Sequence, residues 1–164
     1  MPADPTSFPA LVAELDYPLF IITATADEER SGCIVGFATQ CSIHPPRFLA
    51  CLSNVNRTFA VAARADLLAV HLVPPHATEL VELFGGETDD EIDKFARCAW
   101  TAGPGGVPLL DACPNWFVGR IIERTLLGDH TGYLLEPEEV GHGAAEGAYG
   151  YQRAKDVEAG HPPV

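Results

Sequence analysis

Apolar residues along the chain gather in short runs that alternate with polar turns, a pattern typical of a protein built mainly from strands. Each run is rich in β-branched and aromatic residues and ends at Gly, Pro or charged positions. The predicted strands cover residues 17–26, 33–43, 47–53, 67–73, 115–127 and 131–140. The polar turn between the first two runs predicts a hairpin and therefore antiparallel pairing. Gly36, inside the second run, predicts a bulge or a close approach of another group to the backbone.

A smaller part of the chain has the spacing of short helices. These helices are predicted over residues 7–15, 59–65, 76–84 and 88–98. Ser7 with Pro9 shortly after it is a typical helix start. Thr88 and Glu91 have the T-x-x-E spacing of a capping box, in which each side chain bonds the other residue's backbone N–H. The helices are few and short, so we expect them as insertions between strands and not as a separate layer.

The remaining segments are connections and a tail. Residues 101–108, TAGPGGVP, have the composition of a loop. From Gly141 onward Gly, Ala and Glu become frequent and hydrophobic periodicity ends. We expect one domain over residues 1–140 and a C-terminal tail over 141–164 that is flexible or packs on a dimer partner. Mostly antiparallel strands with helical insertions indicate a β-barrel or a β-sandwich.

Composition and charge limit the classes of molecule that can bind this chain. The chain has 164 residues, of which 47% are hydrophobic, which is enough for one domain with a real core. Its net charge of −13 at pH 7 repels phosphate backbones, so nucleic acids and anionic membranes are unsuitable partners. A small anionic ligand can still bind where backbone N–H groups and a few arginines meet it locally.

Cysteine usage and the N-terminus indicate a cytoplasmic protein. The five cysteines are odd in number, scattered and without a C-x-x-C pair, which predicts buried reduced thiols and no disulfide framework. The first fifteen residues lack the basic start and apolar run of a signal peptide. No apolar stretch has the length needed to span a bilayer.

Familiar catalytic motifs are missing from the sequence, so a bound cofactor is an alternative to catalysis by protein side chains. The sequence contains no G-x-S-x-G, P-loop, H-E-x-x-H or G-x-G-x-x-G motif, and its histidines show no metal-ligand spacing. His71 lies in an apolar strand, where a hydrogen-bonded core histidine is the favoured interpretation, and no metal site is predicted. Asp129–His130, inside LLGDHTGYLL, has good turn chemistry, and the residues alone favour a plain hairpin turn. A bound cofactor would supply the chemistry that these side chains do not.

Several segments in order resemble one known family. The stretches are GCIVGFATQCSIHPPRFLACLSNVNRT, ELFGG, GVPLLDACPNWFVGRI and GDHT. Together they resemble the flavin reductase domain family, whose fold is the FMN-binding split barrel, over about residues 14–136. The resemblance implies an antiparallel, Greek-key-like split β-barrel with a few short helices, and a homodimer with the flavin at its interface.

The resemblance also implies a set of site residues. The flavin ring and ribityl chain would lie along the second strand, with polar positions shortly after it. The residues implied there are Ile34, Val35, Gly36, Phe37, Ala38, Thr39 and Ser42. Asn56, Arg57 and Thr58 would hold the phosphate, since a guanidinium and a hydroxyl before a helix suit a dianion. Without the family, NVNRT would be a plain helix cap. His130 would contact the nicotinamide, with Asp129 shaping the turn.

The activity implied by the resemblance is an NAD(P)H:flavin oxidoreductase. It would use NADH or NADPH to reduce FMN, or FAD, and supply reduced flavin to a separate flavin-dependent monooxygenase. Two departures keep alternatives open. Ile34, Gly36 and Phe37 stand where the family has Thr and Ser, and the C-terminal segment EGAYGYQRA only faintly matches the family's aromatic one. The alternatives are an FMN-binding protein without reductase activity, or a binder of another planar cofactor such as a deazaflavin or haem.

Overall fold

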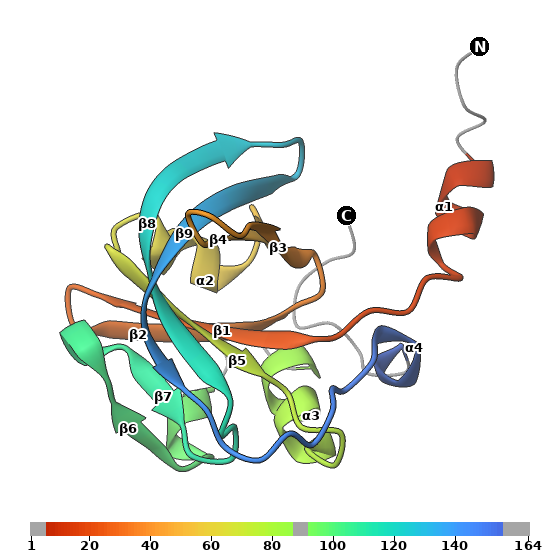
Figure 1. The fold of residues 1–164 in the computed structure, drawn as a ribbon. Coiled ribbons are helices and arrows are strands. Elements are labelled where there is room, and N and C mark those ends of the chain that lie inside the picture. Colours follow the sequence, from red (N-terminus) through yellow and green to blue (C-terminus); the bar gives the residue numbers. More distant parts are fainter. Residues whose placement is uncertain (1–5, 87–91, 156–164) are drawn as a thin grey trace.

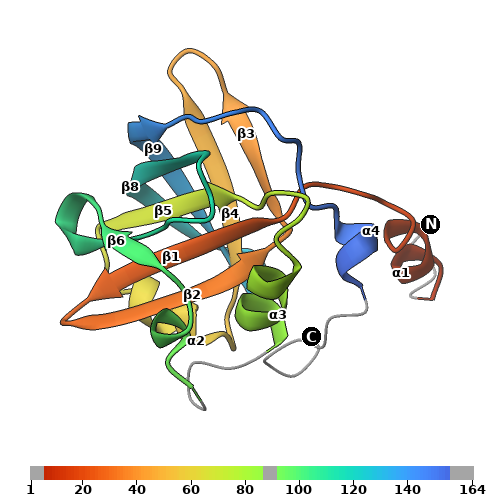
Figure 2. The same cartoon turned by 90° about the horizontal axis from the view of Figure 1, so that it is seen from below.

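Seven strands form one antiparallel sheet that curls around an apolar interior, and one helix packs into that interior through Val61 and Ala62 (Figures 1 and 2). The computed structural model of the chain describes residues 6–86 and 92–155. The sheet order is β2-β1-β5-β8-β9-β4-β3. Its strands are β1 (Phe20–Ala26), β2 (Glu29–Val35), β3 (Ala38–Ser42), β4 (Arg47–Ser53), β5 (Leu67–Leu72), β8 (Trp116–Leu126) and β9 (His130–Gly141). The two edge strands, β2 and β3, are consecutive in the chain, which brings the edges together. The predicted antiparallel barrel is confirmed.

The first hairpin is as predicted, with a tighter turn than its polar sequence suggests. Ala26 pairs with Glu29, so only Asp27 and Glu28 connect β1 to β2. Both have positive φ, 50° and 67°, as a two-residue turn of the type I′ class requires. The remaining polar residues of the predicted turn already belong to β2.

The second predicted strand, residues 33–43, is wrong as one element. It is divided at Gly36–Phe37 into β2, which pairs with β1, and β3, which pairs with β4. Gly36 packs against the ring of Tyr17, and a Cβ added at Gly36 would lie 2.5 Å from Tyr17 Cε2. The expected close approach at Gly36 is therefore present, as a break between two strands.

The core has two parts because β1 is buried on both faces. Ile22 faces the barrel interior together with Leu52, Val70 and Tyr133. Ile21 points the other way, into a second cluster beneath α3 (Thr78–Gly86). A strand buried on both faces favours apolar residues at successive positions, which explains the continuous apolar run at residues 19–22.

Three of the predicted helices are present with different bounds, and one further helix lies in the tail, where none was predicted. They are α1 (Ser7–Val12), α2 (Arg57–Ala62), α3 and α4 (Tyr151–Ala154), with short 3₁₀ helices at Lys94–Ala96 and Pro104–Gly106. Asn56 caps α2, since its side chain accepts a hydrogen bond from the backbone N–H of Thr58 at 2.8 Å. The capping box at Thr88 and Glu91 lies outside the described residues. Of the helix predicted over 88–98, the described part contains only the first 3₁₀ turn.

Two further segments differ from the prediction. The loop 101–108 is flanked by two short paired strands, β6 (Trp100–Ala102) and β7 (Pro108–Leu110). The C-terminal tail, as far as Lys155, folds against its own chain: Gly150 pairs with Pro18, and Tyr149 is only 3% exposed. Periodicity could not reveal this, because the tail is held by isolated aromatic anchors.

The predicted buried histidine is present, but only two of the five cysteines are buried. His71 is fully buried, as predicted; Leu110 N–H donates to its Nε2 at 3.0 Å, so its Nδ1 carries the proton donated to the Ile21 carbonyl at 2.9 Å. The five cysteines are free thiols. Cys41, however, is exposed on β3, so not every cysteine is buried as expected. Among the described residues, no helix is both long and apolar enough to cross a membrane.

Candidate functional site

A cavity of about 280 Å³ opens at the break between β2 and β3. Segments far apart in sequence meet there: the chain before β1, the end of β2, the end of β4, the start of β9 and the start of α4. The lining residues, which define the aromatic cavity, are Tyr17, Leu19, Cys33, Ile34, Val35, Gly36, Phe37, Cys51, Ser53, Asn56, His130 and Tyr151. Small-molecule sites are mostly apolar hollows with a few polar groups, and this cavity has that character.

Four rings form one wall of the aromatic cavity. Tyr17 and Tyr151 are stacked, with centroids 4.6 Å apart and planes inclined by 14°. Phe37 lies 6.5 Å from Tyr17 and 5.0 Å from His130, tilted against each. Because Phe37 is 57% exposed, its ring offers a free face. Aromatic faces of this kind favour a flat, conjugated ligand.

Tyr17 keeps its proton at ordinary pH. Burial raises the pKa of its phenol above the usual value, and the neighbouring Tyr151 and Asp16 raise it further. Burial likewise raises the pKa of the Cys51 thiol on the opposite wall. Tyr17 and Cys51 therefore present a neutral hydroxyl and a neutral thiol to the cavity.

Ser53 is the polar group of the cavity that lacks a partner. Its side chain is 8% exposed, and its Oγ is buried without a hydrogen bond among the described residues. A buried hydroxyl without a partner is unfavourable by about 1–3 kcal/mol, so such atoms in binding sites commonly serve a ligand. Sequence reasoning did not select Ser53. The available signal was its place as the last residue of an apolar strand, directly before NVNRT.

His130 is held by the turn that precedes it. Its Nδ1 lies 2.7 Å from Asp129 Oδ1, which fixes the ring orientation. The turn itself is tied down: Asn54 N–H donates to the Asp129 carbonyl at 2.9 Å, and Gly128 has a φ of 119° that favours glycine. Asp129 is therefore a turn residue that orients His130, and His130, the first residue of β9, lines the cavity.

The predicted site residues divide into two groups. The structure brings six of them together on the cavity lining: Ile34, Val35, Gly36, Phe37, Asn56 and His130. It does not place Ala38, Thr39, Ser42, Arg57 or Thr58 there. The Thr39 hydroxyl is exposed and donates to the Gln40 carbonyl. Sequence reasoning missed the cavity residues Tyr17 and Tyr151. Tyr151 reaches the cavity because the C-terminal segment folds back onto the chain.

The predicted phosphate residues differ from expectation in their contacts. Thr58 is fully buried, and its hydroxyl lies 2.8 Å from Ser31 Oγ on β2, facing the interior. Its backbone N–H is already bonded to the Asn56 side chain. The interior hydrogen bond and burial direct the Thr58 hydroxyl away from solvent, and its contact with a phosphate stays a prediction.

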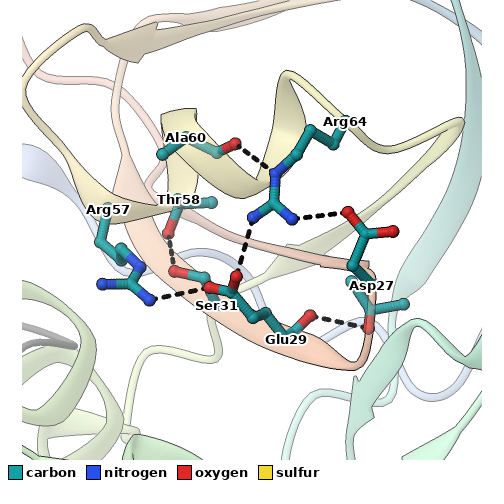
Figure 3. A network of polar contacts seen from close by, with 8 residues as sticks. Asp27, Glu29, Ser31, Arg57, Thr58, Ala60 and Arg64 are labelled. Carbon is teal, nitrogen blue, oxygen red and sulfur yellow. Dashed lines mark hydrogen bonds and ion pairs between the residues drawn. The ribbon is translucent and has the colours of Figure 1, made fainter.

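Arg57 belongs to a network of four charged side chains on α2 and the first hairpin (Figure 3). Its Nη2 lies 2.7 Å from Glu29 Oε2, and the other Glu29 oxygen lies 3.1 Å from Arg64. Arg64 also pairs with Asp27 at 2.7 Å. The pKa of Glu29 is lowered, chiefly by its hydrogen bond with Arg57. In the described parts of the chain, no cluster of His, Cys, Asp and Glu has the arrangement of a metal site.

Comparison with known proteins matches most of the chain. Residues 12–159 match the family model described as flavin reductase like domain. The FMN reductase (NADH) RutF of Methylorubrum extorquens is 25% identical over 79% of this chain. The reductase component of 4-hydroxyphenylacetate 3-monooxygenase from Pseudomonas aeruginosa is 27% identical over 82% of this chain and 79% of its own length. The match spans 63% of the length of the first of these relatives, so less than two thirds.

Solved structures share the fold. A flavin reductase domain protein from Arthrobacter superposes with a TM-score of 0.82 over 90% of this chain and 91% of its own, at 21% identity. The NADH:FAD oxidoreductase SgcE6 of Streptomyces globisporus gives a TM-score of 0.82 over 92% and 91%, at 19% identity. At these identities the likeness concerns the fold.

Proposed function

The chain belongs to the flavin reductase like domain family, and on that premise we propose that it is an NAD(P)H:flavin oxidoreductase acting on FMN or FAD. The relatives named above include an FMN reductase that uses NADH and a monooxygenase reductase component. We propose hydride transfer from the nicotinamide to the flavin, a reaction whose chemistry is carried by the cofactors and needs no nucleophile from the protein.

The observation that carries this proposal is the aromatic cavity with its unpartnered Ser53 hydroxyl. A flavin ring is flat and conjugated, and its edge carries carbonyl oxygens and nitrogens that a hydroxyl can meet. The cavity volume of about 280 Å³ is near the lower end of the ~300–1,000 Å³ typical of ligand sites. It therefore suits the ring system, while the phosphate arm would be held beyond it. In these respects the residues present fit a flavin.

The protein's contribution is binding and orientation. When bound, the flavin supplies the redox chemistry by accepting a hydride from the nicotinamide. Phe37 would pack against the flavin ring, Ser53 would bond its polar edge, and Asn56 and Arg57 would meet the phosphate. His130, fixed by Asp129, would position the nicotinamide ring on the open side. The correct mutual orientation of the two bound rings contributes a large part of the rate enhancement of hydride transfer.

The test is an anaerobic reduction assay. Purified protein is mixed with NADH or NADPH and added FMN or FAD, and the flavin absorbance at about 450 nm, which belongs to the cofactor, is followed. Protein-dependent bleaching supports the reductase and identifies its preferred pair of substrates. Flavin binding without bleaching would favour a flavin-binding protein without reductase activity. Absence of flavin binding, with another chromophore in the spectrum of the purified protein, would favour the other planar cofactor.

We also propose a homodimer and a monooxygenase partner. Large exposed apolar side chains lie on Phe37, which lines the cavity, and on segments next to Asn56 and His130 in the chain, namely Val55, Leu126 and Leu127. Exposed apolar surface of this kind marks an interface. Sedimentation of the purified chain should give a dimer that Leu126→Glu weakens; a monomer in the unsubstituted chain would refute the homodimer.

A flavin-dependent monooxygenase as consumer of the reduced flavin is tested by coupled turnover of the two proteins.

A further inference from the structure

The charged network of Asp27, Glu29, Arg57 and Arg64 lies where the flavin phosphate is proposed to bind, and this inference rests on the proposed function. Asn56 lines the aromatic cavity, and Arg57 is the next residue. The network contains two guanidinium groups and two carboxylates, so its net charge is zero. A phosphate that approaches Arg57 meets a cation already neutralised by its neighbours.

We propose that Glu29 determines specificity by lowering the preference of the site for phosphorylated over unphosphorylated flavin. Its carboxylate occupies Arg57 at 2.7 Å and would repel a phosphate dianion that binds the same guanidinium. FMN carries that phosphate and riboflavin does not. The chain therefore accepts riboflavin nearly as well as FMN, and Arg57 serves the phosphate only in competition with Glu29.

The position of Glu29 supports a role in competition. Arg57 and Glu29 side chains are 43% and 42% exposed, so the ion pair is not sealed in the core. Exposed pairs are weak and can exchange partners, unlike buried ones. The lowered pKa of Glu29 keeps its carboxylate charged through the neutral range. The competing charge is therefore present under any conditions in which the phosphate is a dianion.

The chain offers a matched control in the same turn. Asp27 pairs with Arg64 at 2.7 Å, whereas Glu29 reaches Arg57. Asp27→Asn removes one negative charge two residues from Glu29, and Asn tolerates the positive φ of 50° at this position. Comparing Glu29→Gln with Asp27→Asn separates the contact with Arg57 from the general loss of one negative charge.

The experiment measures the ratio of the riboflavin Kd to the FMN Kd by flavin fluorescence titration. In Glu29→Gln this ratio should rise about three- to tenfold, and in Asp27→Asn by less than about twofold. Adding Arg57→Ala to Glu29→Gln should abolish the rise, since the gained contact needs the guanidinium. Thermal unfolding of each variant, expected near the unsubstituted midpoint, confirms that all are folded.

Three outcomes overturn the inference. An unchanged ratio in Glu29→Gln, an equal rise in Asp27→Asn, or a rise that survives Arg57→Ala would each show that Glu29 does not act through Arg57. Failure of the proposed function looks different: neither flavin would bind any variant or the unsubstituted protein. In that case the inference falls with the function on which it rests.

Discussion

At the residue scale, we propose that His130 contacts the nicotinamide and contributes little to flavin binding. It lies beside the exposed Phe37 ring and is oriented by Asp129. We expect His130→Ala to lower turnover with NADH or NADPH by about tenfold, because orientation of the nicotinamide is lost, while flavin Kd changes little. Steady-state kinetics and flavin titration check this. His76→Ala, at an exposed histidine of another segment, is the control, and unchanged turnover in His130→Ala would leave His130 as a turn residue only.

Replacing Ser53 should affect the stability of the ligand-free protein and its affinity for flavin differently. Replacing it with Ala removes a buried hydroxyl without a partner, so the ligand-free protein should be as stable or slightly more stable. If that hydroxyl serves the flavin, the same change should weaken flavin binding by about five- to tenfold, the value of one hydrogen bond. Urea unfolding of the ligand-free protein and flavin titration measure the two effects. A loss of stability without a loss of affinity would show that Ser53 is structural.

The limits of sequence reasoning at this scale are illustrated by NVNRT. The sequence could indicate a helix cap, and Asn56 does cap α2. It could not indicate where the next two side chains point, since their partners come from β2 and its turn. Thr58 bonds Ser31, which is 27 residues away, and Arg57 bonds Glu29, which is 28 residues away. Contacts of that sequence separation depend on the closed barrel and leave no local pattern.

At the scale of elements, the break between β2 and β3 creates the cavity, and Gly36 permits it. A Cβ at Gly36 would force the Tyr17 ring away from its stack with Tyr151. Gly36→Ala should therefore lower the melting temperature and weaken flavin binding by about tenfold, because the cavity wall is displaced. In a double-mutant cycle, Tyr17→Ala should remove much of the stability loss caused by Gly36→Ala. Additive effects would mean that the two residues do not oppose each other.

His71 ties three strands together and gives the fold a pH dependence. From β5 it donates to the Ile21 carbonyl on β1 and accepts from Leu110 N–H on β7. Burial lowers its pKa to about 4, against 6.5 in the unfolded chain. The stabilisation is complete above pH 6.5 and is lost as the pH falls toward 4, because the unfolded chain takes up the proton first. The total is about 3 kcal/mol.

Urea unfolding between pH 4.5 and pH 6.5, a window set by these two pKa values, measures the effect. His71→Leu should flatten the pH dependence there, though it also leaves the Ile21 carbonyl and Leu110 N–H without partners and so is less stable overall. A direct NMR titration of the imidazole in the unsubstituted protein decides the matter even if the variant does not fold. A His71 pKa near its ordinary value would contradict the prediction.

The elements themselves were largely accessible from the sequence. Apolar runs with turn residues between them identified β1, β4, β5, β8 and β9, because each of these strands has buried apolar residues. The break at Gly36 was not resolved, since the residues on both sides favour a strand. The fold of the C-terminal tail was also missed. Tyr149 and Tyr151 are buried or stacked one at a time, and single anchors carry no periodicity.

At the scale of the whole molecule, the net charge of −13 opposes the approach of an anionic ligand. A phosphate monoester carries about −1.5 to −2 at neutral pH, and the Debye length falls from about 30 Å at 0.01 M salt to about 8 Å at 0.15 M. Near the cavity the network of Arg57 and Arg64 is neutral, so no local positive field offsets the repulsion at long range. The two flavins should therefore differ in how salt affects their association.

We expect the association rate constant of FMN to rise severalfold between about 0.01 M and about 0.15 M salt, since screening relieves the repulsion. Riboflavin has no phosphate, so its rate constant should change by less than about 1.5-fold over the same range. Stopped-flow quenching of flavin fluorescence measures both, with riboflavin as the control for general salt effects. A rate for FMN that falls with salt would mean that the guanidinium of Arg57, and not the charge of the whole chain, governs the field at the cavity mouth.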